Sequence, residues 1–403
     1  MNKFRLLLCA FLIASLFVSV LKAQEEDVEK KLEGYIFTEN VRLKCTPVKN
    51  QFRSGTCWSY AALGMLEAEL IRIGKGEYNL SEAFIVYHTY AQKAVDYVRW
   101  NGAINFGPGG AFHDVIAVIE QFGIVPNSQY DGLVIGEKNF VHNEMDNVLK
   151  SYVDAIVKNP NKKLTPVWHK GYTGILDAYL GQLPSEFEYQ GKKYTSKTFA
   201  QSLGLNWSDY REITSFVHHP FYEDFIIEIP DNWMLAKVYN IPLDDLISVI
   251  DESLNHGYSV AWASDVSEKG FSWKNGIAIV PDEENPDISG TDRDRWEKLS
   301  NKDRTDELYK FDQPVKEKTI SPQMRQEAFD NYQTTDDHGM VIIGRAFDQK
   351  GTKYYIVKNS WGNDDHKYGG YFYASENFVR YKTTNIMVNI NALSKELKKK
   401  IKL

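Results

Sequence analysis

Three short segments of this sequence hold the residue types that nucleophilic catalysis needs. The first has a thiol, Cys57, with an amide, Gln51, six residues upstream. The second has an imidazole, His338, and the third has another amide, Asn359, followed two residues later by the indole of Trp361. A cysteine nucleophile needs a base, a group that orients the base, and a hydrogen-bond donor for the oxyanion. The three segments together supply all of these, although each one alone says little.

The segment that follows the thiol predicts a helix with Cys57 in its first turn. Residues 57–72 are rich in Ala, Leu and Met, lack Pro and contain a single Gly, so we expect a central, buried helix. The positive end of a helix stabilises a thiolate, and we therefore expect it to lower the pKa of Cys57. Two further helices are expected at 83–98, with Ser81 as the N-cap, and at 111–122.

The pattern changes from helical to strand-like near residue 258. Residues 138–250 have a mixed but mainly helical pattern, interrupted by Pro and Gly. Segments rich in Val, Ile and Tyr then predict strands at 258–263, 276–280, 339–347, 354–358, 370–374 and 385–391. Helices followed by an antiparallel sheet indicate an α+β fold. We expect the polar stretch 282–336 to be a surface excursion between two core strands.

The first 23 residues have the pattern of a secretory signal peptide. Lys3 and Arg5 form a short positive start, an apolar run follows, and Ala23 precedes an acidic stretch. The apolar run is short of the roughly 20 residues that a membrane-spanning helix needs. We therefore expect cleavage near Ala23 and an exported product, periplasmic or secreted, with no membrane anchor.

The charge of the mature chain argues against nucleic acid as a partner. The full chain has a formal net charge of −7, and loss of Lys3, Arg5 and Lys22 makes it −10. Such an acidic protein is not expected to bind nucleic acid specifically. The lysines of 395–402 are expected to be the solvated end of a helix.

The cysteine count allows at most one disulfide in the mature chain, between Cys45 and Cys57. Because a permanent bridge would block the proposed nucleophile, we expect Cys45 to be a free, buried thiol. A metal site is not expected either. His218 and His219 are adjacent, so their rings point different ways unless the backbone turns, and no HExxH or CxxC spacing is present. We expect no cofactor.

The three segments, read as QFRSGTCW, DHGM and KNSWG, resemble those of papain-like cysteine peptidases. Within them the chain is most similar to the bleomycin hydrolase and aminopeptidase C family, from about residue 35 to about residue 390. This narrower resemblance rests on NLSE at 79–82, GPGG at 107–110 followed by His113 and Asp114, and YDG at 130–132. It also fits the 281 residues between Cys57 and His338, where a small papain-type enzyme has about 130–150.

The resemblance implies a role for each matching residue. Cys57 is the nucleophile that forms a thioester acyl-enzyme, His338 holds the thiolate as an ion pair and protonates the leaving amine, and Asn359 orients the imidazole. Gln51 and the backbone N–H of Cys57 form the oxyanion hole. Trp361 shields the His–Asn hydrogen bond from water.

The resemblance also implies a fold, an assembly and a substrate. The fold is papain-like and two-lobed, with a helical N-terminal lobe, an antiparallel β-sheet or barrel C-terminal lobe and a long insertion at about 138–250. Gly109 and Gly110 would let a substrate backbone approach closely. The substrates are peptides, the activity is that of an aminopeptidase, and the assembly is a homo-oligomer, a hexamer, with contacts from the insertion.

Two departures from the family leave alternatives open. The export signal is one. The other is the segment after Asn391, ALSKELKKKIKL, which lacks the family's Pro/Trp-rich C-terminal arm that enters the cleft. Either this tail still reaches the cleft, or another element blocks it, or the enzyme is an endopeptidase with an open cleft. A transglutaminase-like acyl transferase and a non-catalytic nucleic-acid-binding relative are further alternatives. Asn as the orienting residue favours the peptidase over the transferase.

Overall fold

The computed structural model describes residues 34–161, 163–284 and 299–403, which form two compact units. The expected signal peptide at 1–23 lies outside the described residues. The larger unit comprises Glu39–Val280, Glu317–Ala346 and Lys353–Leu403, and the described part of the smaller comprises residues 34–38, 281–284, 299–316 and 347–352. No helix among the described residues has the length and apolar character needed to cross a membrane.

The smaller unit contains one described helix, α10 (Asn301–Leu308). Its cap is Ser300, whose hydroxyl accepts a hydrogen bond from the N–H of Asp303. Within the same unit, the ammonium of Lys350 donates to the carbonyl of Pro314 at 2.8 Å. The proposed catalytic residues all belong to the larger unit.

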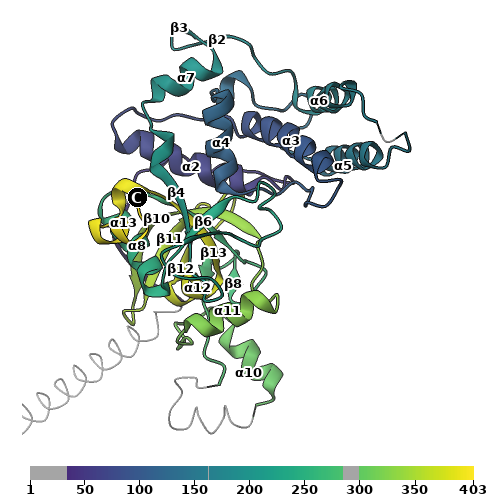
Figure 1. Ribbon diagram of the computed structural model, residues 1–403. Helices are drawn as coiled ribbons and strands as arrows, with labels where there is room; N and C mark the ends of the chain where they lie inside the picture. Colours follow the sequence, from purple (N-terminus) through teal and green to yellow (C-terminus); the bar gives the residue numbers. More distant parts are fainter. Residues whose placement is uncertain (1–33, 162, 285–298) are drawn as a thin grey trace, which may run out of the picture. The chain divides into compact units, whose positions relative to one another are not determined.

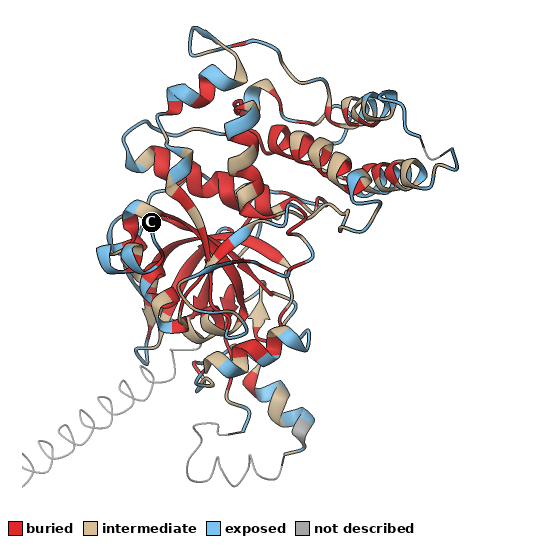
Figure 2. Ribbon diagram, in the orientation of Figure 1, coloured by how far each residue is buried: buried red, intermediate tan, exposed pale blue. Residues whose placement is uncertain are grey.

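Helices dominate the first half of the larger unit (Figure 1). The three that the sequence predicts are α2 (Cys57–Arg72), α3 (Glu82–Arg99) and α4 (Phe112–Phe122). The hydroxyl of Ser81 accepts from the N–H of Phe84 and caps α3, as expected. Helix α2 is buried along nearly its whole length (Figure 2). Three helices follow: α5 (Asn143–Val157), α6 (Val167–Leu180) and α7 (Ser196–Leu203), the last preceded by the hairpin β2 (Phe187–Tyr189) and β3 (Lys192–Tyr194).

A large sheet forms the second half of the larger unit, in the strand order β5-β6-β4-β13-β7-β10-β11-β12-β9-β8, with β1 (Phe37–Arg42) added beside β10. The predicted strands are present as β7 (Val260–Ser264), β9 (Ile277–Ala278), β10 (His338–Asp348), β11 (Lys353–Lys358), β12 (Tyr371–Ser375) and β13 (Thr383–Asn389). Most neighbours are antiparallel, whereas β4 with β6 and β12 with β9 run parallel. The expected α+β arrangement is confirmed.

Besides β1 and the β2–β3 hairpin, four further strands lie where the sequence pattern gave no strand. They are β4 (Tyr210–Thr214), β5 (Asp224–Ile226), β6 (Lys237–Asn240) and the two-residue β8 (Phe271–Ser272). Each is too short to establish an alternating pattern of its own, and hydrogen bonding to neighbouring strands stabilises its extended conformation. Strand β4 pairs along β13, with Ile213 opposite Ile386.

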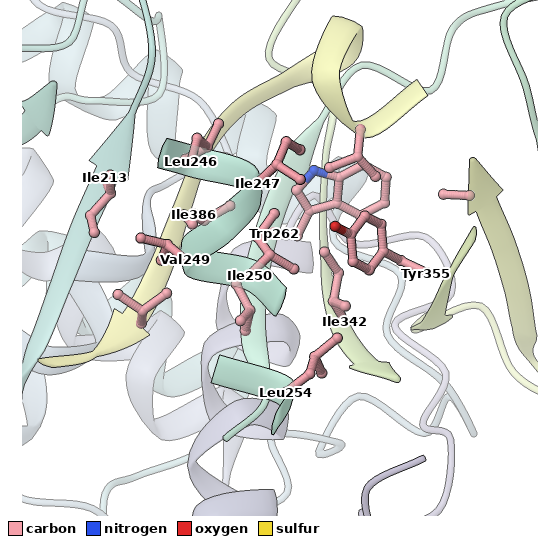
Figure 3. Close-up of a cluster of buried hydrophobic side chains, with 14 of the residues drawn as sticks. Ile213, Leu246, Ile247, Val249, Ile250, Leu254, Trp262, Ile342, Tyr355 and Ile386 are labelled. Atoms are coloured by element: carbon pink, nitrogen blue, oxygen red, sulfur yellow. The ribbon is translucent and has the colours of Figure 1, made fainter. Parts of the chain in front are cut away.

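The main hydrophobic core lies between this sheet and α8 (Leu243–Asn255) (Figure 3). Trp262, Ile342 and Ile386 contribute from neighbouring strands, and Leu246 and Ile250 contribute from the helix. The indole of Trp262 donates to the hydroxyl of Thr383 at 2.7 Å, so its polar atom is satisfied within the core. The sheet is thereby held as a firm base for the residues at its strand ends.

Two helices near the C-terminus complete the larger unit. Helix α12 (Glu376–Lys382) joins β12 to β13, and α13 (Lys395–Lys400) follows β13. Leu397 and Ile401, at this end of the chain, belong to the core that α8 covers.

The segment 282–336 is not wholly a surface excursion, which corrects that expectation. Its helix α11 (Pro322–Asp330) buries Arg325, whose guanidinium donates to the carbonyl of Ser215 at 2.7 Å and lies 4.6 Å from the ring centroid of Phe216. Burial lowers the pKa of Arg325 to about 9. A charged side chain packed in this way was not foreseeable from a polar stretch of sequence.

The core predicts a large stability loss on truncation of Ile250. The side chain is fully buried, so Ile250→Ala removes buried methylene groups and leaves a cavity that should cost about 2–5 kcal/mol of unfolding free energy. The matched control is Ile73→Ala, because Ile73 is 39% exposed and should change stability by less than about 0.5 kcal/mol. Urea denaturation with equal m-values measures both, and equal losses would contradict the assigned core.

Candidate active site

Cys57 is the first residue of α2, and its thiol lies beside the start of β10. The backbone N–H groups of Gly339 and Trp58 both hydrogen-bond the sulfur. Gly339 allows this approach because a Cβ there would lie 3.3 Å from the Cα of Trp58 and 3.1 Å from the ring of Phe112. The structure therefore brings Cys57 next to the residue that follows His338.

His338 and Asn359 meet at one end of the neighbouring strands β10 and β11. The Nε2 of His338 lies 2.7 Å from the Oδ1 of Asn359. The same oxygen accepts the backbone N–H of Ser360 at 2.8 Å, which fixes the orientation of the amide. Nε2 must then carry the imidazole proton, and Nδ1 remains as the basic nitrogen.

Trp361 covers the His338 imidazole. The two rings stack with centroids 4.6 Å apart and an interplanar angle of 27°. Phe271 and Trp273 pack against the indole in turn. His338 is only 4% exposed, so its hydrogen bond to Asn359 is formed in a site from which water is largely excluded.

Gln51 is held by a residue to which the sequence gave no role. The hydroxyl of Ser360 donates to the Oε1 of Gln51 at 2.6 Å, and the Nε2 of Gln51 donates to the carbonyl of Ser54 at 2.8 Å. One amide hydrogen of Gln51 is left for another acceptor. Ser360 stands in the KNSWG segment between two residues of predicted function, and that position was the available signal.

Gly109 and Gly110, which the resemblance assigns to substrate binding, pack closely against other side chains of this chain. A Cβ on Gly110 would be 2.9 Å from the indole of Trp58, and one on Gly109 would be 1.9 Å from the carboxylate of Asp231. The ammonium of buried Lys93 donates to the carbonyls of Gly107 and Gly109. Both positions therefore need glycine for close packing, and Asp231 becomes a neighbour of the site.

Burial sets the protonation of the thiol and the imidazole. Desolvation, with smaller contributions from the charges of Asp336 and Asp231, raises the pKa of Cys57 to about 12. The N–H groups of Gly339 on β10 and of Trp58 at the helix start lower the pKa of Cys57, but burial outweighs them, so the expected net decrease is corrected. Desolvation also lowers the pKa of His338 to about 4.

These two shifts share one cause, the cost of a single buried charge. Proton transfer from the thiol to the imidazole creates two opposite charges side by side, and each then stabilises the other. We therefore expect Cys57 and His338 to ionise as a pair, with neither holding its charge alone.

Cys45 and His113, which the sequence analysis also singled out, make their contacts away from the proposed triad. Cys45 is a free thiol, as expected, but it is half-buried and lies 3.4 Å from the hydroxyl of Tyr371. His113 is the second residue of α4, and its Nδ1 lies 3.0 Å from a carboxylate oxygen of Glu212. Asp231 and Asp336 are the neighbours of Cys57 that the sequence did not identify, since they are remote from it in the chain and stand in no motif.

Comparison with known proteins identifies relatives along most of the chain. The model of the Peptidase C1-like family matches residues 290–403. Aminopeptidase C of Listeria monocytogenes is 23% identical over 95% of this chain and 89% of its own length, and that of Streptococcus thermophilus is 23% identical over 89% and 84%. Mitochondrial cysteine proteinase 1 of Saccharomyces cerevisiae is 20% identical over 92% of this chain and 80% of its own.

The chain is related to the C1-like cysteine peptidases. The fold agrees, because the crystal structure of PepW from Lactobacillus rhamnosis superposes with a TM-score of 0.67 at 20% identity, covering 91% of this chain and 84% of PepW. The resemblance and the enzyme class inferred from the sequence, a cysteine-type peptidase, are both confirmed.

The paired ionisation predicts how this peptidase reacts with iodoacetamide once His338 is replaced. In His338→Ala the thiol has lost its proton acceptor, and its pKa stays raised. Since thiolate is the reactive form, alkylation of Cys57 should fall at least 100-fold at pH 7. It should then rise about tenfold per pH unit beyond pH 9, where an ordinary thiol of pKa about 8.5 would level off.

Mass spectrometry of the Cys57 peptide measures this alkylation, and Cys45 in the same sample serves as the internal reference. A rate for Cys57 that is high and flat through neutral pH in His338→Ala would contradict the paired ionisation.

Proposed function

We propose that this peptidase is a cysteine aminopeptidase with Cys57, His338 and Asn359 as its catalytic triad. The thiol transfers its proton to the Nδ1 of His338 and the sulfur attacks the peptide carbonyl. The imidazolium then protonates the leaving amine, which departs and leaves a thioester on Cys57. His338 next takes a proton from water, the resulting hydroxide attacks the thioester, and the acid is released as the thiol is restored.

The hydrogen-bonded series that joins His338, Asn359, Ser360 and Gln51 carries this proposal. It links the base, its orienting amide and the oxyanion donor through contacts of 2.6 to 2.8 Å. The free amide hydrogen of Gln51 and the backbone N–H of Cys57 would stabilise the oxyanion, and loss of one such donor typically costs about 2.7–4 kcal/mol of transition-state stabilisation. Each member restricts the rotation of the next.

The preference for a free N-terminus is inferred from the relatives. Two of them carry the name aminopeptidase C and align along 89% and 95% of this chain. Peptides with a free amine are accordingly the proposed substrates. The alternatives, an endopeptidase with an open cleft and an acyl transferase, differ from this proposal in the acyl donor or acceptor they use.

Export and assembly are proposals that rest on the sequence. The positive start, apolar run and small residue at 1–23 support a cleaved signal peptide. Assembly into a homo-oligomer, a hexamer, is proposed from the resemblance to the bleomycin hydrolase family.

The proposed triad predicts that Cys57→Ala and His338→Ala each lower turnover at least about a thousandfold, whereas Cys45→Ala retains it. The assay compares an aminoacyl reporter with a free amine and the same reporter N-acetylated, using residues 24–403 under reducing conditions. Wild type should cleave the free-amine form and lose activity on the blocked one.

Other results would redirect the assignment. Iodoacetamide-sensitive hydrolysis that persists in Cys57→Ala would exclude this nucleophile. Equal cleavage of both reporters would indicate an endopeptidase, and release of the reporter group only when an amine acceptor is added would indicate a transferase.

A further inference from the structure

Asp231 lies against the backbone that leads away from the nucleophile. Trp58, the neighbour of Cys57, packs on Gly110, and the next residue, Gly109, lies directly beneath the Asp231 carboxylate. The chain thus places a carboxylate along the glycine segment beside the reacting sulfur. An extended substrate that continued past its first residue in this direction would meet this side chain.

Within the described part of the chain, few contacts offset the negative charge of the Asp231 carboxylate. Its oxygen accepts a long hydrogen bond, 3.4 Å, from the amide of Asn105. Lys93 is nearby, but its ammonium already donates to the carbonyls of Gly107 and Gly109. Burial and the charge of Asp114 outweigh the attraction of Lys93 and raise the pKa of Asp231.

We propose that Asp231 binds the α-ammonium group of the substrate's first residue and closes the cleft beyond it. This inference rests on the proposed aminopeptidase function and names the residue that would enforce it. In an aminopeptidase substrate the ammonium is separated by one Cα from the carbonyl that Cys57 attacks. A carboxylate is the group that best binds an ammonium, through charge-assisted hydrogen bonds.

The same contact would couple substrate binding to the nucleophile. The negative charge of Asp231 is one of the causes that raise the pKa of Cys57. An ammonium bound to Asp231 cancels much of that charge at the sulfur, so a free-amine substrate favours the thiolate. An N-acetylated substrate brings no charge and gives no such assistance.

The test is Asp231→Asn, which keeps the size of the side chain and removes its charge. We expect kcat/KM on the free-amine reporter to fall at least tenfold, chiefly through KM, while cleavage of the N-acetylated reporter stays the same or rises. Asp224→Asn is the matched control, since Asp224 is an exposed residue that pairs with Lys237 at the surface, and it should match wild type.

The outcomes separate this proposal from the function it rests on. If wild type cleaves neither reporter or prefers neither, the aminopeptidase function fails and this proposal fails with it. If wild type prefers the free amine and Asp231→Asn keeps that preference unchanged, the function stands and the role of Asp231 is overturned. Thermal unfolding of both variants shows whether the fold is retained, and Asp231→Ala repeats the comparison should the amide perturb it.

A second, independent feature is a cluster of His218, His219 and Glu228. The backbone turns at this pair, which is the condition under which adjacent rings can face the same partner. The Nε2 atoms of His218 and His219 lie 3.1 and 3.0 Å from the two carboxylate oxygens of Glu228. The three ligand atoms all lie within 4.8 Å of one another.

The hydrogen bonds of His218 fix the role of its Nδ1. The Oε1 of Gln326 accepts the backbone N–H of Val217 at 2.8 Å and lies 3.0 Å from the Nδ1 of His218. Nδ1 must therefore donate, and in the neutral ring Nε2 is an acceptor. Nε2 then meets the Glu228 carboxylate either through a proton of its own, as an imidazolium, or through a cation that both atoms bind.

We infer that this cluster binds one Zn²⁺ ion. Two imidazoles and a carboxylate are a ligand set that Zn²⁺ uses, and a second contact that orients a ligand histidine, here from Gln326, is typical of such sites. The ion would tie the turn at His218 and His219 to the segment after β5 that carries Glu228. Its role would be structural, since none of these side chains contacts the proposed triad.

The test measures Zn²⁺ binding to residues 24–403 with both thiols alkylated, so that cysteine cannot bind the ion. Competition with a chromophoric chelator should give one Zn²⁺ per chain and a raised melting temperature. His218→Ala and His219→Ala should each lose the ion and the stabilisation. His256→Ala, at an exposed histidine outside the cluster, should keep both. Absence of binding in wild type, or an unchanged stoichiometry in the two variants, would overturn the site.

Discussion

The close packing of α2 on β10 is the constraint on which the proposed site depends. Gly339 has no side chain, and the backbone of Trp58 comes within van der Waals distance of its Cα. A second glycine, Gly64, faces Val341 one turn and a half further along the helix, where a Cβ would lie 3.3 Å away. With small residues at the interface, the thiol at the helix start reaches the backbone of Gly339, the residue that follows His338.

Burial that follows from this packing shapes the chemistry. A buried thiol and a buried imidazole each resist a separate charge, and we expect the pair to become charged together. The neighbouring carboxylates of Asp231 and Asp336 raise the pKa of the thiol further. In the proposed mechanism, reactivity depends on His338 as the proton acceptor and on any positive charge that a substrate brings.

Much of this architecture is readable from the sequence because local and long-range preferences agree there. Residues 57–72 match α2 at both ends, and the strand predicted at 339–347 matches β10 to within one residue at each end. The residues of the proposed triad stand out in the sequence because their types and order are specific. The strands β4, β5 and β6 were missed because they are short and owe their conformation to pairing with the sheet. The pKa of Cys57 was predicted with the wrong sign because a sequence shows a helix start but not its desolvation.

Residues that act through space rather than through a motif were the least predictable. Asp231 is 174 residues from Cys57 and meets the site through Gly109. Ser360 stands in the KNSWG segment, but its hydrogen bond to Gln51 joins residues 309 positions apart and could not be read from the sequence. The rings of His218 and His219 both reach Glu228 only because the backbone turns at this pair. In each case the tertiary fold supplies the contact on which the role depends.

The most direct test of the account is to trap the acyl-enzyme. Wild-type protein mixed with a free-amine aminoacyl ester and quenched in acid within one turnover would be examined by intact-mass and peptide-mapping mass spectrometry. The account predicts one aminoacyl group per chain, attached to Cys57 and removed by hydroxylamine as a thioester is. Turnover with no such adduct, or an adduct on another residue, would contradict it.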